Sequence, residues 1–166
     1  MIKANKRRAR IFVFDSGVGG LSVLRELIAL YGNADYHYYA DNALFPYGDL
    51  SADALQNRVL ELLEKPLGEG NYDLCVIACN TASTQVLPIL RTNYELPFVG
   101  TVPAIKPACQ KSKTGLISVL ATPAAVSRDY THNLIREFAS RCRVNLVGAP
   151  RLAELVEEVL AGGRVS

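Results

Sequence analysis

Residues 10–31 read RIFVFDSGVGGLSVLRELIALY, and this stretch decides the fold class. Residues 10–14 are almost entirely apolar, which predicts a buried strand. A glycine-rich turn follows at residues 15–20, and apolar side chains then recur at helical spacing as far as residue 31. That spacing predicts an amphipathic helix. A strand joined to a helix by a short turn is the building unit of α/β proteins.

The same unit recurs along the rest of the chain. Further strands are predicted at residues 36–40, 74–78, 98–99, 115–120 and 144–147. Helices are predicted at residues 51–65 (ended by Pro66 and Gly68), 81–91, from about 103, 123–139 and 152–160. Six strand–helix units predict an α/β fold, a mostly parallel sheet flanked by helices. The strands read as apolar throughout, as expected when both faces of a sheet are covered.

Composition limits the classes of protein that fit. With 166 residues, 49% hydrophobic and 20% charged, the chain has the balance of a soluble globular protein. A net charge of +2 is too small to argue for a nucleic-acid partner, and none is expected. The basic residues of the first ten positions are interpreted as a solvated, frayed terminus, with an arm contacting RNA or membrane as the alternative: Lys3, Lys6, Arg7, Arg8 and Arg10.

Targeting and metal signals are absent from the sequence. The first apolar run ends at Asp15 and is shorter than the roughly 7–15 residues of a secretory core. No stretch approaches the roughly 20 apolar residues that span a bilayer. Four cysteines without a Cys-x-x-Cys pair, and two histidines, predict neither a zinc site nor a redox motif. We therefore expect reduced thiols in a cytoplasmic protein that uses no metal.

Polar and nucleophilic residues follow the predicted strands. In a parallel sheet the ligand binds beyond the carboxyl ends of the strands, so these residues are expected to meet around one polar small-molecule site. They are residues 15–17 (DSG), 41–42 (DN), 79–81 (CNT), 100–103 (GTVP) and 121–123 (ATP).

The glycine-rich turn at residues 15–22 (DSGVGGLS) is the first candidate ligand site. Free backbone N–H groups at the start of a helix favour an anion, and glycines allow close approach. Nucleotide binding is the alternative, but a dinucleotide fingerprint would need glycine where Ser22 stands, and Asp15 would repel a pyrophosphate. A Walker A loop is missing, and a tight turn without a ligand also fits these residues.

Cys79 is the candidate reactive thiol, since it stands between a predicted strand and a helix that begins near Thr81. The helix dipole and nearby N–H groups favour a thiolate there, which predicts that Cys79 is the most acidic and most readily alkylated thiol. An inert buried thiol is the alternative for Cys79, and it is the preferred interpretation of the other three cysteines, Cys75, Cys109 and Cys142.

A Cys–His hydrolase is disfavoured, because His37 falls inside a predicted strand and His132 falls in the middle of a helix. The loop at residues 41–49 (DNALFPYGD) is long for a strand–helix connection. Long ordered loops in compact domains are often functional, although a surface loop with an aromatic plug would look the same.

Taken together, five segments resemble the glutamate racemase family within the aspartate/glutamate racemase group. They occur in the family's order, cover roughly residues 10–130, and favour the glutamate enzymes over the aspartate ones. The segments are residues 14–22 (FDSGVGGLS), 39–41 leading to 46–48 (YAD and PYG), 78–83 (ACNTAS), 99–108 (VGTVPAIKPA) and 120–122 (LAT) with Ser127.

The resemblance implies interconversion of L- and D-glutamate without a cofactor or metal, supplying D-glutamate for peptidoglycan and thus for the cell wall and cell shape. In this family two cysteines face opposite sides of the α-carbon and act as acid and base. The resemblance makes Cys79 one of them and Asp15 its polar helper. It implies that the substrate is held by Asp15, Ser16, Tyr47, Gly48, Asn80 and Thr81.

The chain departs from the family in one respect. The second family cysteine lies in a Gly-Cys-Thr-His stretch that these 166 residues lack, and neither Cys109 nor Cys142 stands in that context. The resemblance therefore implies a first lobe at residues 1–100 without its C-terminal return, and part of a second lobe at residues 101–166. The 166 residues alone are expected to be inactive.

A non-catalytic protein that binds an acidic amino acid or a protein partner is the alternative to the racemase. A nucleotide-binding regulatory domain rests on the glycine turn alone. A homo-oligomer is left open by the sequence.

Overall fold

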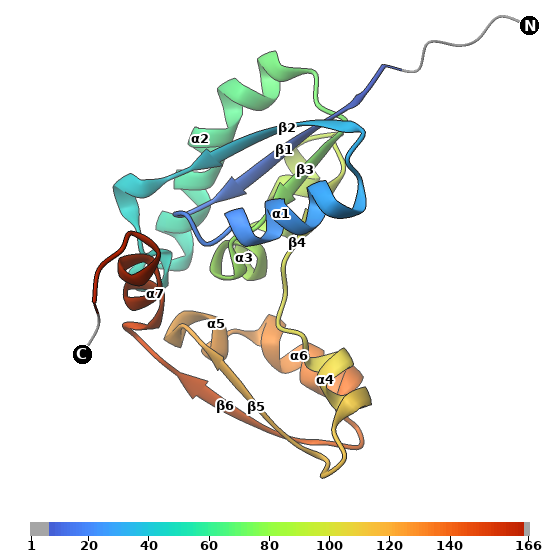
Figure 1. Ribbon diagram of the computed structural model, residues 1–166, viewed down its shortest axis with the longest axis vertical. Coiled ribbons are helices and arrows are strands. Elements are labelled where there is room, and N and C mark those ends of the chain that lie inside the picture. The colour runs from blue at the N-terminus through green and yellow to red at the C-terminus, as the bar shows by residue number, and fades with distance from the viewer. Residues whose placement is uncertain (1–6, 165–166) are drawn as a thin grey trace, which may run out of the picture.

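The protein is described by a computed structural model that covers residues 7–164 and contains two parallel sheets (Figure 1). The first sheet has the order β2-β1-β3-β4 and the second pairs β5 with β6. The α/β class and the parallel strands flanked by helices are confirmed. In chain order the elements are β1 (Ala9–Asp15), α1 (Leu21–Leu30), β2 (Ala34–Ala40), η1 (Asn42–Leu44), η2 (Tyr47–Asp49), α2 (Ala52–Gly70), β3 (Leu74–Ile77), α3 (Asn80–Asn93), β4 (Phe98–Gly100), α4 (Ile105–Lys111), β5 (Leu116–Ala121), α5 (Pro123–Ser127), α6 (Asp129–Phe138), β6 (Arg143–Gly148) and α7 (Leu152–Leu160).

The central strands of the first sheet, β1 and β3, are buried on both faces. Successive side chains of a strand point in opposite directions, so those of β1 enter two different layers. Ile11 and Val13 of β1 pack with Leu24 and Leu27 of α1 on one face. Phe12 and Phe14 belong to a larger core on the other face, with Leu55, Val59, Leu63, Val86 and Leu90 of α2 and α3. The side chains of the continuous apolar run in β1 therefore pack into two separate hydrophobic cores.

The second sheet is covered less completely. Side chains of β5 alternate between exposed and half-buried, and those of β6 do so over most of its length. Leu116 and Leu120 of β5 are 62% and 56% exposed. The expectation of strands covered on both faces holds for β1 and β3. It is wrong for β5 and β6, and also for β2, whose side chains alternate between exposed and half-buried after Ala34; in β4, Val99 is 52% exposed.

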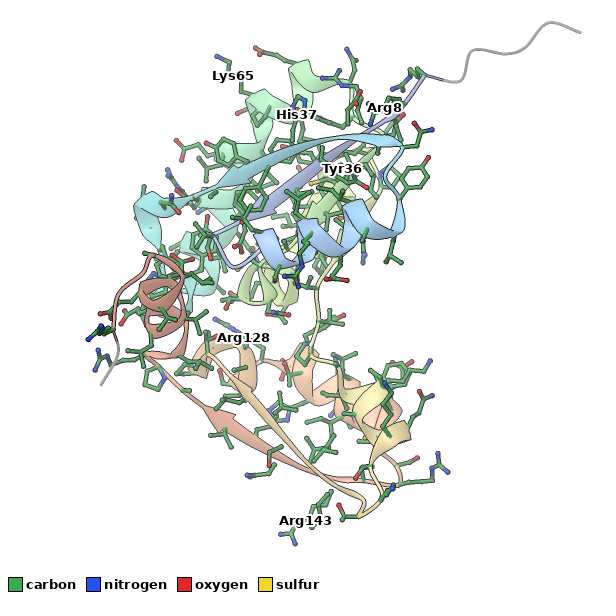
Figure 2. All side chains as sticks on the ribbon, viewed as in Figure 1. Arg8, Tyr36, His37, Lys65, Arg128 and Arg143 are labelled. Carbon is green, nitrogen blue, oxygen red and sulfur yellow. The ribbon has the colours of Figure 1, made fainter. Side chains whose placement is uncertain are left out.

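Two predicted helices have different ends from those expected. The helix predicted to stop at Pro66 continues through it to Gly70, and Leu67 just beyond the proline packs on the larger core. That burial opposes the usual cost of proline inside a helix. The helix predicted at residues 123–139 is instead two helices, α5 and α6, which meet at Arg128 (labelled in Figure 2). The buried Thr131 hydroxyl donates to the carbonyl of Ala125 at 2.6 Å, which satisfies a group that the break would leave free.

The basic N-terminal residues that the structure describes are anchored rather than frayed. Both terminal nitrogens of the Arg7 guanidinium donate to the carboxylate of Asp73, at 3.0 and 2.6 Å. Arg8 donates to the carbonyl of Ala34 at 2.8 Å. Arg7 and Arg8 are exposed, as expected of a solvated terminus, but their hydrogen bonds contradict the expectation that the terminus is frayed from Arg7 onward. Lys3 and Lys6 lie outside the described residues.

The carboxyl ends of the strands in the first sheet face the second sheet across a shared cavity. We propose that the lobes divide after residue 100, so that β1–β4 form the first lobe and β5–β6 with their helices form the second. The chain passes between them through residues 101–104, seen in Figure 1 as the long connection from β4 to α4. Within residues 7–164 no helix is both long and apolar enough to cross a membrane.

Candidate active site

A cavity of about 680 Å³ lies between the two lobes, at the carboxyl ends of the first sheet's strands. This volume is in the range of small-molecule sites. The first lobe, the connection at 102–104 and the second lobe all contribute to its walls. All seven residues singled out in the sequence line this cavity: Asp15, Ser16, Tyr47, Gly48, Cys79, Asn80 and Thr81.

Cys79 caps the N-terminus of α3. Its sulfur accepts a hydrogen bond from the Ala82 N–H at 3.4 Å and lies 3.4 Å from the Ser16 hydroxyl oxygen. Burial raises the pKa of the Cys79 thiol, and the carboxylate of Asp15 raises it further, while the hydrogen bonds from Ser16 and Ala82 lower it. The predicted acidity of Cys79 is therefore wrong, because loss of water outweighs the helix start. A thiolate with a raised pKa is scarcer at neutral pH and is a stronger base.

Asp15 ends β1 and is buried beside Cys79. Its Oδ2 accepts from the Gly20 N–H at 2.7 Å and from the Tyr38 hydroxyl at 3.2 Å. Gly20 has to be glycine here, since a Cβ would lie 2.8 Å from the Cβ of Asp15 and 2.9 Å from that of Ala78. Burial and Asp15 raise the pKa of Tyr38, so the tyrosine remains a neutral hydrogen-bond donor.

The N–H groups of the glycine-rich turn are used by the chain's own carboxylates. Gly20 donates to Asp15, and Val18 donates to Oε1 of Glu157 at 2.7 Å. The expectation that this turn offers these N–H groups to a bound anion is corrected on this point. A nucleotide phosphate would have to displace two carboxylates, so the nucleotide alternative loses its support.

Tyr47 is held by a buried ion pair. Its hydroxyl donates to Oδ2 of Asp41 at 2.7 Å, and Arg58 of α2 donates to both carboxylate oxygens of Asp41, at 2.9 and 2.8 Å. The hydrogen bond with Arg58 lowers the pKa of Asp41, and burial raises that of Tyr47. With the hydroxyl engaged by Asp41, Tyr47 borders the cavity as the end of an ordered loop and places Gly48 beside it.

The second lobe meets the site at two further points. The hydroxyl oxygens of Thr81 and Thr122 lie 3.2 Å apart, and Thr122 in turn caps α5. A Cβ on Gly48 would lie 3.3 Å from the Cβ of Thr122, so glycine permits this close approach. These contacts and the bond from Val18 to Glu157 join the lobes around the cavity.

Sequence reasoning missed Tyr38, Arg58 and Glu157. Each lies within a regular element and not directly after a strand, so the strand-end rule could not select it. Glu157 belongs to the amphipathic α7, and its spacing alone does not tell which polar side chain faces the cleft. Arg58 is likewise one of several charged residues on α2.

The histidines lie elsewhere. His37, in the middle of β2 (Figure 2), has its Nδ1 at 2.7 Å from the Tyr72 hydroxyl, and His132 is an exposed residue of α6. Neither is among the residues that line the cavity. The site therefore does not assemble a Cys–His pair, in agreement with the sequence argument.

Similarity to known proteins settles the family. A match to the family described as Asp/Glu/Hydantoin racemase covers residues 25–163. The chain belongs to the Asp/Glu/Hydantoin racemase family. The match contains Tyr47, Gly48, Cys79 and Glu157, while Asp15 and Ser16 precede it.

Relatives within this racemase family are similar over most of the chain. The glutamate racemase of Brucella anthropi is 53% identical over 156 residues, which are 93% of this chain and 56% of that protein. The crystal structure of Escherichia coli glutamate racemase, in complex with L-glutamate and the activator UDP-MurNAc-Ala, matches with a TM-score of 0.90 and 44% identity over 96% of this chain and 60% of that one. The glutamate racemase isoform RacE1 of Bacillus anthracis matches with a TM-score of 0.84 and 31% identity, over 94% and 59%. The chain thus spans somewhat more than half the length of these relatives.

Glu157 is expected to hold α7 against the first lobe. No residue of α7 is buried, so its bond with Val18 is a large part of what fixes the helix. Replacing Glu157 by alanine should speed amide hydrogen exchange across residues 152–160 about tenfold, which corresponds to roughly 1.4 kcal/mol. The matched control is Glu158→Ala on the exposed side of the same helix. Equal exchange in both variants would contradict the role assigned to Glu157.

The buried thiol of Cys75 is expected to lower the free energy of unfolding at alkaline pH. Burial raises the pKa of the Cys75 thiol to about 12, whereas an unfolded thiol titrates near its ordinary value of about 8.5. Between these values the unfolded state releases a proton that the folded state keeps, so the stability is complete below about pH 8.5 and falls as the pH rises. Urea unfolding between pH 8 and 10.5 should show this fall. Cys75→Ala should make the slope shallower by up to about 1.4 kcal/mol per pH unit, and an unchanged slope would show that Cys75 does not contribute.

Proposed function

We propose that the protein is a glutamate racemase, an isomerase that interconverts L- and D-glutamate without a cofactor, with Cys79 as one of its two acid/base thiols. One observation carries the proposal: a buried thiol stands at a helix start, beside Asp15 and Ser16, in the wall of a cavity between two lobes. The relatives described above are named as glutamate racemases. By the same reasoning the protein would work in the cytoplasm and supply D-glutamate for peptidoglycan.

The chemistry proposed for Cys79 is removal of the α-hydrogen. Its thiolate takes the proton from the α-carbon and becomes a thiol, and the electron pair of the broken C–H bond stays on the substrate. A second acid on the opposite face must then deliver a proton to complete the inversion. Burial, and after it the carboxylate of Asp15, raises the pKa of Cys79, which strengthens the thiolate as a base for a weakly acidic C–H bond.

The substrate groups would be held by polar atoms around Cys79. Asn80 is exposed at the first turn of α3, and Thr81 and Ser16 present hydroxyls beside it. The N-terminus of a helix and neutral donors both suit a carboxylate. Asp15 supplies the negative charge that an α-ammonium group requires, and Gly48 leaves room at the loop end.

Binding of L-glutamate to the 166-residue chain tests the proposal. We expect saturable binding by calorimetry, stronger for L-glutamate than for L-aspartate. Asn80→Ala should weaken it about tenfold or more, since a hydrogen bond to a charged group is worth about 1.5–3 kcal/mol. Asn93→Ala at the opposite end of the same helix is the matched control. Absence of saturable binding, or an equal loss in both variants, would count against the site.

A further inference from the structure

Two cysteines that the cavity does not use lie close together in the second lobe. Cys109 is on α4, and Cys142 directly precedes β6, 33 residues further along the chain. Both are free and partly exposed, whereas Cys75 and Cys79 are buried. Arg143, the neighbour of Cys142, marks the end of the second sheet that is farthest from the first lobe in Figure 2.

The backbone fixes the second cysteine in place. The Cys142 N–H donates to the carbonyl of Ala139 at 2.9 Å, and the next N–H, of Arg143, donates to the carbonyl of Gly115 at 2.7 Å. The Cys142 thiol then lies 3.6 Å from the carbonyl oxygen of Cys109.

We propose that Cys109 and Cys142 form an oxidisable dithiol, a modification site that closes to an intramolecular disulfide when the protein meets a peroxide. Two features carry this inference: the Cys142 sulfur lies 3.6 Å from the backbone carbonyl oxygen of Cys109, although the two residues belong to different elements, and both thiols are partly exposed. The positive charge of Arg141 also favours the Cys109 thiolate. The inference is independent of the proposed racemase activity, because neither thiol lines the cavity.

The oxidation balances with hydrogen peroxide as the oxidant. The Cys109 thiolate attacks one peroxide oxygen, the O–O bond breaks, and hydroxide leaves, so that Cys109 becomes a sulfenic acid. The Cys142 sulfur then attacks the Cys109 sulfur, the S–O bond breaks, and a second hydroxide leaves. The two thiol protons convert both hydroxides to water. The pair of sulfurs loses two electrons, and the peroxide gains them.

The surroundings of Cys109 set the conditions for this reaction. Burial and the Cys142 thiol raise the pKa of Cys109, and Arg141 lowers it in part. The thiolate is therefore a minor species at neutral pH. Oxidation of the two cysteines is for this reason expected with excess peroxide rather than with traces of it. The resulting disulfide would enclose β5, α5 and α6 in one covalent loop and so restrict the unfolded second lobe.

Peptide mapping of the 166-residue chain tests the dithiol. The protein is treated with excess hydrogen peroxide, remaining thiols are alkylated, and the digest is analysed by mass spectrometry without reduction. We expect a Cys109–Cys142 linked peptide from the monomer, its loss on treatment with dithiothreitol, and a Tm raised by roughly 5 °C in the oxidised protein. Cys109→Ser and Cys142→Ser should each remove both the linked peptide and the rise in Tm.

Other outcomes would overturn the proposal. These are a disulfide that involves Cys75 or Cys79, a disulfide between two chains, or sulfenic and sulfinic acids on Cys109 and Cys142 without a link between them. An oxidised wild-type protein whose Tm is unchanged would contradict the covalent loop. Cys75→Ala is the matched control and should leave the linked peptide in place, since Cys75 is buried in the first sheet.

Discussion

Cys79→Ser is expected to abolish exchange of the α-hydrogen of glutamate in the 166-residue chain. In the unmodified chain a thiolate at Cys79 can remove that hydrogen on the face it reaches and return a solvent-derived one to the same face. Acid/base assistance of this kind is worth roughly 10²–10⁴-fold, and a serine hydroxyl is far too weak an acid to replace it. Proton NMR of each glutamate enantiomer in D₂O measures the exchange directly.

The same experiment separates exchange from inversion. Inversion needs a second acid on the opposite face, and Cys79 is the single cysteine among the described residues that line the cavity. Circular dichroism of L-glutamate should therefore stay constant while deuterium enters the α-position of one enantiomer. Cys142→Ser is the matched control and should retain exchange. Loss of optical activity at an ordinary enzymatic rate would reveal a second acid/base group within these 166 residues.

Replacing Asp41 by alanine should lower the free energy of unfolding more than replacing an exposed charged residue does. Asp41 is almost fully buried and receives hydrogen bonds from both Arg58 and Tyr47. Asp41→Ala leaves the Arg58 charge without its partner in a half-buried place and the Tyr47 hydroxyl without an acceptor. Arg58 keeps 25% of its side chain exposed, so we expect a loss of about 1–3 kcal/mol, most of it from the Tyr47 hydroxyl left without an acceptor. Urea unfolding at pH 7 measures the loss.

An exposed ion pair provides the control for Asp41. Asp35 lies 3.3 Å from Arg8, with both side chains about half exposed, and such pairs contribute roughly 0–1 kcal/mol. Asp35→Ala should thus change stability little. Asp41→Ala should also weaken glutamate binding, because the loop ending at Tyr47 and Gly48 loses its anchor. A similar stability loss in the two variants would mean that the buried pair does not hold this loop.

The sequence predicted the parts of the site that depend on strand direction. Asp15 ends β1 and Cys79 comes just after the neighbouring parallel strand β3. The ends of parallel strands meet at one edge, so their proximity could be inferred without coordinates. Glu157 and Arg58 could not be selected, since a helix presents several charged residues and tertiary packing decides which one faces the cleft. The prediction that Cys79 is acidic was wrong. The sequence shows that Cys79 stands at the start of a helix, but it does not show how far the thiol is removed from water.

The fold was predicted to a similar extent. The order of strands and helices followed from apolar runs and their spacing, and it matches the structure closely. The passage of α2 through Pro66 depends on burial of Leu67, which is a tertiary effect. The open face of the second sheet was missed because the apolar strands β5 and β6 read like covered ones.

The division of β1 between two cores ties folding and chemistry to one register. Because side chains of a strand alternate with a period of two, a single-residue insertion after Arg10 would turn Phe12 and Phe14 toward α1 and present Ile11 and Val13 to α2 and α3. The same shift would carry Asp15 away from Gly20 and Cys79 at the strand end. The alignment of Asp15 with Cys79 therefore depends on the packing of the hydrophobic side chains of β1, and lengthening this strand by one residue would disturb both.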